Sequence, residues 1–406
     1  MGLFGALRLP REILFGSGQR KALGIVAAKS GRRALVCTDE RFAATPSFAE
    51  MLADLGNWGI EIPVHDQVQP DVPSDTVAAC VAAAKGFAPD MVIGIGGGSC
   101  LDMAKCAALL LTHGGALADY YGEFKVPGAV LPVIAVPTTA GTGSEVTPVA
   151  VISDPVRVLK VGISSPHLIA TAAICDPDLT LTCPLGLTAM TGADALTHAI
   201  EAFTAKRQSG EASLPQQHVF IGKSALTDHY ALLAMRLLGR SLETAVKDGS
   251  NAEARADVML AAMAAGCAFG TAGTAAAHAI QYPVGALTHT AHGTGVACAL
   301  PYVMAYNRSS SLSEMAEIGT ALGVANGSVE ERSQGAIAAV RRLFGAIGIA
   351  PTLAKLGLAE DQLDWTAEQA LGIDRLIKNN PRPLDLPDMK TLLRAAYDGD
   401  MTRATA

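Results

Sequence analysis

The chain has 406 residues, of which 50% are hydrophobic and 17% are charged, with a formal net charge of -7 at pH 7. This composition indicates a compact protein of about two or three domains and differs from the polar, charge-rich composition of a disordered chain. Lysine and arginine are scattered along the chain, so it lacks the basic stripe of a nucleic-acid-binding protein. We therefore expect no nucleic-acid partner.

No segment reaches the roughly 18 consecutive apolar residues of a membrane-spanning helix. The amino-terminal stretch MGLFGALRLPREILFGSG lacks the basic start and sustained apolar run of a signal peptide. We expect a cytoplasmic protein with no membrane partner. The eight cysteines form no CxxC pair and lie mostly in apolar segments, which favours reduced, buried thiols.

The first half of the chain alternates short β-branched segments with alanine-rich helical patterns, which is typical of an α/β domain with a mostly parallel sheet. Strands are predicted over residues 32–39, 90–96 and 130–137. Between the first two, SDTVAACVAAAKGF has apolar residues at helical spacing, and Ser74 or Asp75 can cap its amino terminus. These segments predict a β-α-β unit.

After about Pro184 the strand patterns stop, and long stretches rich in alanine and leucine follow, among them 227–248 and 254–280. We therefore predict an α/β domain over residues 1–184 and an all-helical domain over residues 185–406. The segment AKRQSGEASLPQQ, residues 205–217, interrupts the helical periodicity with glycine, serine and proline, which indicates an exposed loop.

The stretch DMVIGIGGGSCLDMAKCAALLL runs from an apolar strand through Gly96, Gly97, Gly98 and Ser99 into a helix. Glycines allow backbone N–H groups to approach a pyrophosphate, and the amino terminus of the following helix favours an anion. An ordinary tight turn between strand and helix is the alternative. The stretch departs from the dinucleotide fingerprint, because Ser99 replaces the third spaced glycine or alanine and no acidic residue follows about 20 positions later.

A suitable acid precedes the glycine turn instead. Asp39 ends the first predicted strand. A carboxylate at this position can accept hydrogen bonds from ribose hydroxyls and repel the 2′-phosphate of NADP. An exposed loop aspartate without a ligand is the alternative.

Asp194 and His198 are four residues apart in TGADALTHAIEAF, so on a helix both side chains lie on one face, one turn apart. His278 follows in an apolar helical stretch, and His292 lies beside a glycine. One carboxylate and three imidazoles suit a divalent iron or zinc ion that leaves room for a substrate oxygen. Each histidine alone is better explained as a core residue, whereas the four residues together favour a metal site.

The remaining histidines near or beyond this cluster have less support. His289 lies close enough in sequence to contact the metal ligands without binding the ion. His167, His218 and His229 are predicted to be surface or packing residues.

With these motifs, the chain resembles the iron-containing alcohol dehydrogenase family, which shares a dehydroquinate-synthase-like fold with glycerol dehydrogenases. The similarity runs nearly end to end and includes FGSGQRKAL, GGGSCLDMAK, PTTAGTGSEVTPVAVISD, CDPDLTLTCPLGLTAMTGADALTHAIEA and NPRPLDLPDMKTLLRAAY. By this resemblance, the cofactor is NAD and the metal is Fe2+, with Zn2+ as the alternative. The four metal ligands correspond to Asp194, His198, His278 and His292.

The resemblance also implies which residues hold the dinucleotide. Gly97, Gly98 and Ser99 correspond to the pyrophosphate-binding turn, and Asp39 falls on the position that favours NAD over NADP. The further candidates for cofactor binding are Asp71, Gly96, Asp102, Thr138, Thr139, Thr142, Thr147, Lys160 and Leu179.

Tyr282 departs from the family pattern. Many members carry a further histidine four residues after the first ligand of the last pair, and here Tyr282 occupies that position. The stretch HAIQYPVG is similar to the subgroup that contains hydroxyacid-oxoacid transhydrogenases. The substrate class therefore includes small alcohols, aldehydes and hydroxyacids, and the group that moves the proton is left open. Tyr282 is one candidate, because a phenolic hydroxyl can donate a proton, although an unperturbed tyrosine titrates at about pH 10.

The resemblance implies an NAD-dependent alcohol dehydrogenase in which a metal ion acts as a Lewis acid on the substrate oxygen while a hydride moves to or from the nicotinamide. We expect a homo-oligomer, a dimer, with the site in a cleft between the two domains. The alternatives are a dehydroquinate-synthase-like lyase that recycles its NAD and a protein that binds metal and nucleotide without catalysis. Net NADH formation with an alcohol distinguishes the dehydrogenase from both.

Overall fold

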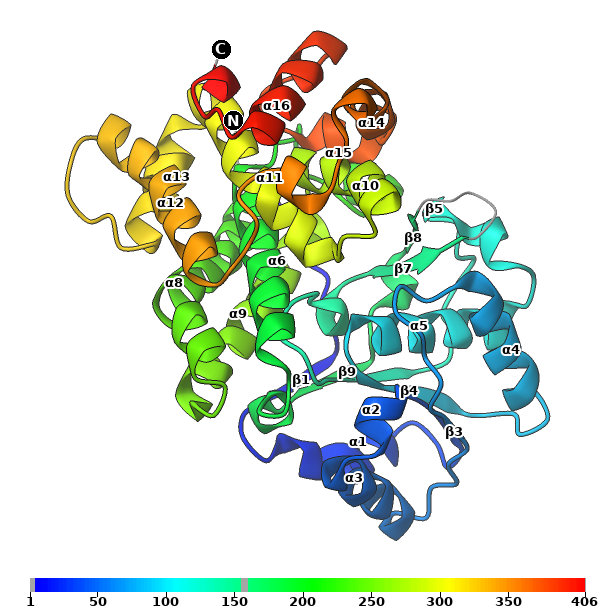
Figure 1. Ribbon diagram of the computed structural model, residues 1–406. Helices are drawn as coiled ribbons and strands as arrows, with labels where there is room; N and C mark the ends of the chain where they lie inside the picture. Colours follow the sequence, from blue (N-terminus) through cyan, green and yellow to red (C-terminus); the bar gives the residue numbers. More distant parts are fainter. Residues whose placement is uncertain (1–3, 155–159, 406) are drawn as a thin grey trace. The chain divides into compact units, whose positions relative to one another are not determined.

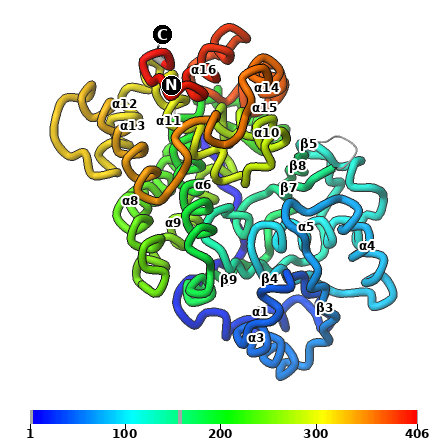
Figure 2. Tube along the Cα trace, in the orientation of Figure 1, coloured from blue at the N-terminus to red at the C-terminus, as the bar shows by residue number. Residues whose placement is uncertain are grey.

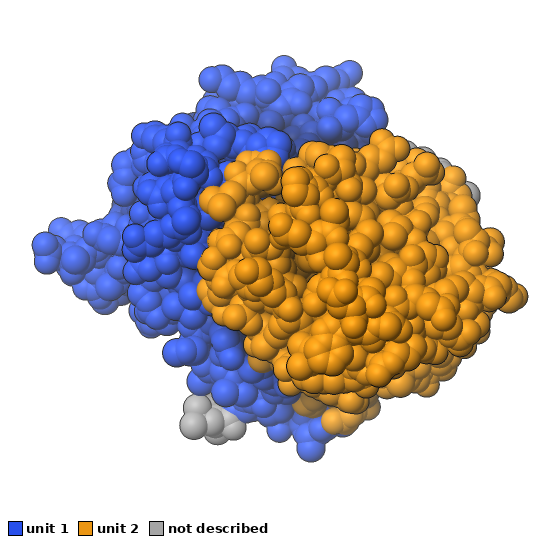
Figure 3. All heavy atoms as spheres, turned by 90° about the horizontal axis from the view of Figure 1, so that it is seen from below, with its two compact units in different colours: residues 1–7, 184–214, 220–406 blue, residues 8–183, 215–219 orange. Residues whose placement is uncertain are grey.

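The computed structural model describes residues 4–154 and 160–405, and Figure 1 labels its helices and strands. The first three residues of the amino-terminal stretch quoted above lie outside the described residues. The chain divides into two compact units, which Figure 3 colours separately. We call residues 8–183 and 215–219 the α/β unit, and residues 1–7, 184–214 and 220–406 the helical unit.

The α/β unit is built on a six-stranded sheet in the order β1-β9-β6-β4-β2-β3, and every pair of neighbouring strands in it is parallel. Its strands are β1 (Glu12–Phe15), β2 (Ala34–Cys37), β3 (Val64–His65), β4 (Met91–Gly96), β6 (Val133–Pro137) and β9 (Ala172–Cys175). The three predicted strands correspond to β2, β4 and β6 and are confirmed, each shorter than predicted. Strands β1, β3 and β9 were not predicted from the sequence.

A second, three-stranded sheet has the order β5-β8-β7. It contains β5 (Gly122–Glu123), β7 (Val149–Ser153) and β8 (Lys160–Ser164). The pairing of β7 with β8 is antiparallel, whereas β5 pairs with β8 in parallel. Because the pairs of the six-stranded sheet are also parallel, the unit is mostly parallel, as predicted.

Both faces of the parallel sheet are buried. On β2, Leu35 and Cys37 belong to a core cluster that includes α4 and α5 side chains, whereas Ala34 and Val36 belong to a second cluster with α1 and α3 side chains. Because successive residues of a strand point to opposite faces, a strand covered on both sides needs a continuous apolar run. The apolar run ALVC of β2 meets this requirement.

The helices of the α/β unit are α1 (Leu23–Ala27), α2 (Glu40–Ala43), α3 (Pro46–Asn57), α4 (Ser74–Ala84) and α5 (Gly98–His113). The predicted helix after the first strand corresponds to α4 and is confirmed. Its predicted cap is wrong: the N-cap residue is Pro73, and neither Ser74 nor Asp75 caps the helix. The Pro73 carbonyl instead accepts hydrogen bonds from the backbone N–H and the hydroxyl of Thr76, which closes the first turn.

The helical unit contains long helices, as predicted for this half of the chain. Its elements are α6 (Leu185–Thr204), α8 (Ala225–Lys247), α9 (Ala252–Ala272), α10 (Ala276–Thr288), α11 (His292–Asn307), α12 (Leu312–Ala321), α13 (Val329–Ala346), α14 (Leu363–Leu371), α15 (Asp374–Asn379) and α16 (Leu386–Asp398). Helices α6, α8 and α9 pack against one another, and α12 and α13 lie side by side (Figure 2).

The alanine-rich stretch 254–280 is interrupted at Gly273, which has a φ of 82° and separates α9 from α10. Positive φ favours glycine, so the break coincides with the residue that tolerates it best. Within residues 4–154 and 160–405, no single helix has the length and apolarity to cross a membrane, although α9 and α10, bent by 102°, pass such a test as a pair.

Most residues of the predicted loop 205–217 are exposed, but the loop contains the short helix α7 (Leu214–Gln217), which the sequence analysis did not predict. All eight cysteines are buried, as predicted.

Candidate metal centre and nucleotide-binding edge

The predicted glycine turn lies at the carboxyl edge of the parallel sheet, where ligands of open α/β sheets bind. Gly96 ends β4 with a φ of 153°, and a Cβ at this position would lie 2.4 Å from the Cys100 Sγ. Helix α5 begins at Gly98, and no side chain caps its amino terminus. Gly97, Gly98 and Ser99 are half-buried, so the unpaired N–H groups of the first helical turn are available to an anion.

Three of the predicted threonines, Thr138, Thr139 and Thr142, follow β6 and line this turn. The Thr138 N–H donates to the Gly96 carbonyl at 2.9 Å. Thr139 and Thr142 face the glycines, since a Cβ on Gly97 would lie 3.4 Å from the Thr139 Oγ1 and one on Gly98 would lie 2.6 Å from the Thr142 Cγ2. The glycines therefore leave space that any side chain would fill.

Asp39 reaches the same edge from the end of β2. Its Oδ1 accepts from the Phe42 N–H at 2.9 Å, which makes Asp39 the N-cap of α2, and its Oδ2 accepts from the Cys100 thiol at 3.7 Å. A Cβ on Gly96 would lie 3.4 Å from that Oδ2. Asp39 thus lies beside the glycine turn and also has a local structural role that the sequence analysis did not consider.

Two more predicted residues, Asp71 and Lys160, lie near Ser99 in the first turn of α5. The Asp71 N–H donates to the Ser99 Oγ at 3.2 Å, and the Lys160 ammonium contacts the Asp71 Oδ1 at 2.6 Å. Both side chains are partly exposed, at 55% for Asp71 and 24% for Lys160. The structure therefore brings Asp71, Ser99 and Lys160 together.

Three other candidates use their side chains inside the α/β unit. The Asp102 Oδ1 accepts from the Ser144 hydroxyl at 2.6 Å and its Oδ2 from the Val151 N–H at 3.0 Å, and burial raises the pKa of this carboxyl. Leu179 packs in the core cluster with α1 and α3 side chains, and Thr147 is buried. Leu179 and Thr147 are thus buried, whereas Asp102 is half-buried.

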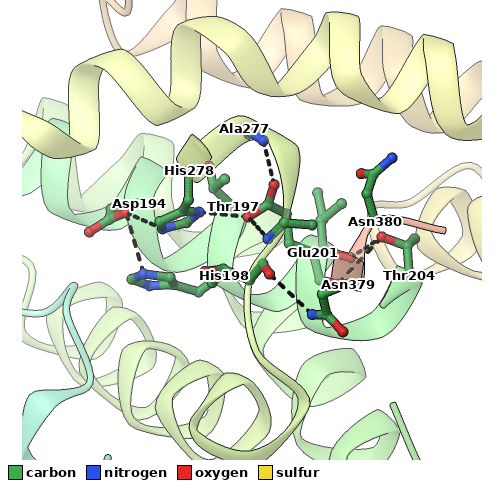
Figure 4. A network of polar contacts seen from close by, with 12 residues as sticks. Asp194, Thr197, His198, Glu201, Thr204, Ala277, His278, Asn379 and Asn380 are labelled. Carbon is green, nitrogen blue, oxygen red and sulfur yellow. Dashed lines mark hydrogen bonds and ion pairs between the residues drawn. The ribbon is translucent and has the colours of Figure 1, made fainter. Parts of the chain in front are cut away.

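The four predicted metal ligands come together in the helical unit. Asp194 and His198 lie one turn apart on α6, His278 lies on α10, and His292 is the first residue of α11. The Nε2 atoms of His198, His278 and His292 lie 3.6, 3.7 and 3.9 Å from the Asp194 Oδ1. Figure 4 shows His198 and His278 converging on Asp194.

The donor set fits a divalent metal ion. A tetrahedral ion with metal–nitrogen bonds of about 2.1 Å spaces its ligand atoms about 3.4 Å apart. The observed separations are close to this spacing, and ligand atoms of Asp194, His278 and His292 all lie within 4.8 Å of one another. The side chains of Asp194, His198 and His278 are 5–6% exposed, whereas His292 is 28% exposed. The accessible side of the cluster is therefore at His292.

Two aromatic rings flank the imidazoles. Phe269 stacks on His198 with ring centroids 4.1 Å apart, and the Tyr282 ring is inclined by 29° to the His292 ring with centroids 6.2 Å apart. Tyr282 is only half-buried. It therefore lies next to the ligand on the accessible side of the cluster.

Glu201 was not predicted from the sequence, and the structure places it beside the candidate metal ligands. Its Oε2 lies 2.6 Å from the His278 Nδ1 and accepts from the Ala275 N–H at 2.9 Å, and its Oε1 accepts from the Ala277 N–H at 2.7 Å (Figure 4). A carboxylate only accepts hydrogen bonds, so the His278 Nδ1 carries the proton and the Nε2 lone pair points toward Asp194. Glu201 thus orients His278 and supplies a negative charge at the amino terminus of α10.

A signal for Glu201 was present in the sequence. Asp194, His198 and Glu201 follow one another at intervals of four and three residues, which places them on one face of a helix. The other histidines do not take this role: His289 is exposed at the left-handed C-cap of α10, and His167, His218 and His229 are exposed, in line with the surface prediction.

Together, these features define a class of protein. Its members combine a glycine turn suited to a dinucleotide at the edge of a parallel sheet with a cluster of aspartate and histidine side chains suited to a metal ion in a helical unit. The model of the iron-containing alcohol dehydrogenase family matches residues 10–177, and the model of the carboxyl-terminal part of the Fe-containing alcohol dehydrogenase family matches residues 188–397. The chain therefore belongs to the iron-containing alcohol dehydrogenase family, and it is a metal-dependent oxidoreductase.

Individual relatives match this chain along nearly their whole length. Long-chain-alcohol dehydrogenase 1 of Geobacillus thermodenitrificans is 38% identical over 370 residues, covering 90% of this chain and 89% of the relative. NAD-dependent methanol dehydrogenase of Bacillus methanolicus is 34% identical and covers 96% and 98% of the two chains. The solved structure of 1,3-propanediol oxidoreductase has a TM-score of 0.90 at 32% identity, covering 98% of this chain and 100% of that chain.

Proposed function

We propose that the enzyme transfers a hydride between a small alcohol or aldehyde, or a hydroxyacid or oxoacid, and NAD, with Asp194, His198, His278 and His292 as the ligands of Fe2+ or Zn2+. The observation that carries the proposal is the convergence of three imidazole Nε2 atoms within 3.9 Å of the Asp194 Oδ1. In this proposal residues 1–184 bind the dinucleotide, and residues 185–406 hold the metal and the substrate.

The protein's own groups have distinct tasks in this reaction. A divalent ion in the cluster supplies Lewis acidity that makes an alcohol hydroxyl more acidic. Glu201 keeps the His278 Nε2 lone pair directed at the ion, because its hydrogen bond fixes the ring. The glycine turn and the amino terminus of α5 bind the pyrophosphate, and Asp39 binds the adenosine ribose.

Tyr282 is the proposed proton-transfer residue, because its ring lies beside the partly exposed His292. Removing its hydroxyl in Tyr282→Phe should lower kcat by about a hundredfold, the lower range of general acid–base catalysis. Metal content should not change, since Tyr282 is not a ligand in this proposal. An unchanged kcat would leave Tyr282 as a packing residue only.

The test of the function combines metal analysis of freshly purified enzyme with turnover assays. Alcohols, aldehydes, hydroxyacids and oxoacids of increasing size are offered with NAD or NADH, and the change in NADH absorbance is followed. We expect about one divalent ion per chain and net NADH formation with at least one alcohol or hydroxyacid. Absence of net NADH formation with every substrate would favour a lyase that recycles its NAD.

We propose that the enzyme prefers Fe2+ to Zn2+, because the family models name iron. Imidazole and carboxylate ligands suit both ions, so metal analysis of the purified enzyme decides between them. We also propose that it works in the cytoplasm as a homodimer. Light scattering of the purified protein measures the oligomeric state.

A further inference from the structure

Lys105 is a buried charge that the proposed reaction does not use. It lies on α5, two turns after Gly98, and its side chain is fully buried. Its ammonium group contacts the Ser144 carbonyl at 2.6 Å, the Val149 carbonyl at 2.7 Å, and the Thr147 carbonyl and the Ser144 hydroxyl at 3.0 Å each. All four oxygens belong to one segment, residues 144–149.

Burying an ammonium group is costly, and burial lowers the pKa of Lys105. An apolar side chain of similar length would fill the same volume without this cost. What an apolar side chain cannot do is draw three carbonyl oxygens and a hydroxyl to one point. The cation therefore fixes the backbone of the segment rather than merely filling the core.

The segment held by Lys105 continues directly into the wall of the glycine turn. The Ser144 N–H donates to the Thr142 Oγ1 at 3.3 Å, and Gly143 between them has a φ of 61°. Thr142 in turn packs on Gly98, so close that a Cβ there would lie 2.6 Å from its methyl group. A continuous chain of contacts therefore leads from Lys105 through Ser144 and Thr142 to Gly98.

Asp102 acts on the same segment from the same helix. Its carboxylate accepts from the Ser144 hydroxyl and from the Val151 N–H. Helix α5 thus presents free N–H groups in its first turn, while Asp102 and Lys105 hold the segment that borders them. Helix α5 therefore supplies the N–H groups that can bind an anion and also holds in place the segment that borders them.

We propose that Lys105 is a positioning residue for the dinucleotide: by fixing residues 144–149, it holds Thr142 against the glycine turn and preorganises the nucleotide-binding edge. This inference rests on the proposed placement of NAD at that edge. Preorganisation increases affinity because the wall need not be ordered when the ligand binds. Lys105 itself contacts no ligand in this account.

The test measures NADH binding by the fluorescence of the bound nicotinamide, with the metal-loaded enzyme and its Lys105→Met variant. Met keeps the length of the side chain and removes the charge. We expect the Kd for NADH to rise at least tenfold, metal content to stay unchanged, and kcat at saturating NAD to change less than threefold. A purely structural role would lower the Tm without this split between affinity and turnover.

Lys223→Met is the matched control. Lys223 is also buried, at 7% exposed, and contacts Asp228 and Glu314 in the helical unit. This variant should lose stability while its Kd for NADH stays that of the wild type. If both variants weakened NADH binding equally, the effect would come from general destabilisation, and the inference would be wrong.

Ser144→Ala keeps the test valid if Lys105→Met fails to fold. This change removes the hydroxyl that Lys105 and Asp102 share and leaves the three carbonyl contacts in place. We expect a Kd increase of about threefold and faster hydrogen exchange in residues 142–151. A wild-type Kd in both variants would overturn the inference about Lys105 and leave the proposed function intact. A wild-type enzyme that binds no NADH would overturn the proposed function.

Discussion

The candidate metal centre and the candidate nucleotide-binding edge are built from different kinds of groups. In the metal centre, every donor is a side chain, and the donors come from three helices, α6, α10 and α11. At the nucleotide-binding edge, many of the groups are backbone N–H groups and short hydroxyl side chains around one turn. Their positions depend on neighbouring segments such as residues 144–149.

This difference predicts different responses to substitution. A metal centre with four ligands loses a quarter of its donors when one side chain is removed, and no neighbour replaces it. At the nucleotide-binding edge, the backbone donors remain after any single side-chain change, so each substitution there should reduce the affinity for the dinucleotide only in part.

The largest effect is expected for His278→Ala. Loss of one imidazole should remove most of the metal and lower kcat/KM by about a thousandfold or more, since Lewis-acid stabilisation is worth several kcal/mol. NADH affinity should change little, because the glycine turn belongs to the other unit. Metal analysis and fluorescence titration measure the two properties, and His229→Ala, at an exposed histidine, is the control. Normal metal content in His278→Ala would remove His278 from the site.

The next effect concerns stability at the other region. Glu145 is 4% exposed, and burial raises the pKa of its carboxyl from 4.5 to about 7, with the charge of Lys105 opposing that rise only in part. The folded protein therefore keeps a proton that the unfolded chain loses, so the free energy of unfolding falls as pH rises from about 4.5 to about 7 and stays low above that range. This difference in pKa corresponds to roughly 3 kcal/mol.

Glu145→Gln removes this cost, because an amide does not ionise. We expect the variant and the wild type to be most alike near pH 4, and the variant to be the more stable protein at pH 8. Unfolding in urea at pH 4, 6 and 8 measures the difference. A constant difference across this range would show that the pKa of Glu145 is the same in the folded and the unfolded protein.

A smaller effect on the metal centre is expected for Glu201→Gln. The amide keeps one acceptor oxygen, but its NH2 group must face either the His278 Nδ1–H or a backbone N–H at the start of α10. Loss of a carboxylate that orients a metal-binding histidine typically costs 10- to 100-fold in metal affinity. Competition between the enzyme and a chelator for Co2+ measures it without an activity assay.

Glu211→Gln is the matched control for this prediction, because Glu211 is exposed in the loop before α7. Its metal affinity should equal that of the wild type. Equal Co2+ affinity in Glu201→Gln and the wild type would mean that the hydrogen bond to His278 does not contribute to metal binding.

The sequence predicted the two regions to different depths, for physical reasons. The spacing of Asp194 and His198 reveals a shared helix face, and an apolar run followed by glycines reveals a strand and turn. Both signals are local. Glu201 was missed because its partners at His278 and the start of α10 are more than 70 residues away, and a glutamate on a helix is usually solvated.

Lys105 was missed for the same reason. A lysine within an alanine-rich helix is ordinarily exposed, and only the return of residues 144–149 over α5 buries it. Short edge strands such as β1 and β3 carry too few residues to show a pattern. Long-range contacts therefore account for most of what the sequence did not predict.

The smallest effect is expected for Asp39→Asn, which tests cofactor choice. The 2′-phosphate of NADP brings about two negative charges, and at roughly 4 Å each repels a carboxylate by about 1 kcal/mol in water and more in a partly desolvated site. The wild type should therefore prefer NAD at least tenfold in kcat/KM. Asn removes the charge and, as an equally good N-cap, keeps the hydrogen bond to the Phe42 N–H. We expect the preference to shrink about tenfold, with metal content unchanged.

Asp39→Gly separates charge from local structure, because glycine removes the capping side chain as well as the charge, at a cost of only a few tenths of a kcal/mol. If repulsion decides the preference, both variants should shift the ratio of kcat/KM for NAD and NADP by the same factor. If only the glycine variant shifts it, space near Gly96 decides the preference rather than charge. An unchanged ratio in both variants would mean that Asp39 serves α2 alone and that the adenosine ribose binds elsewhere.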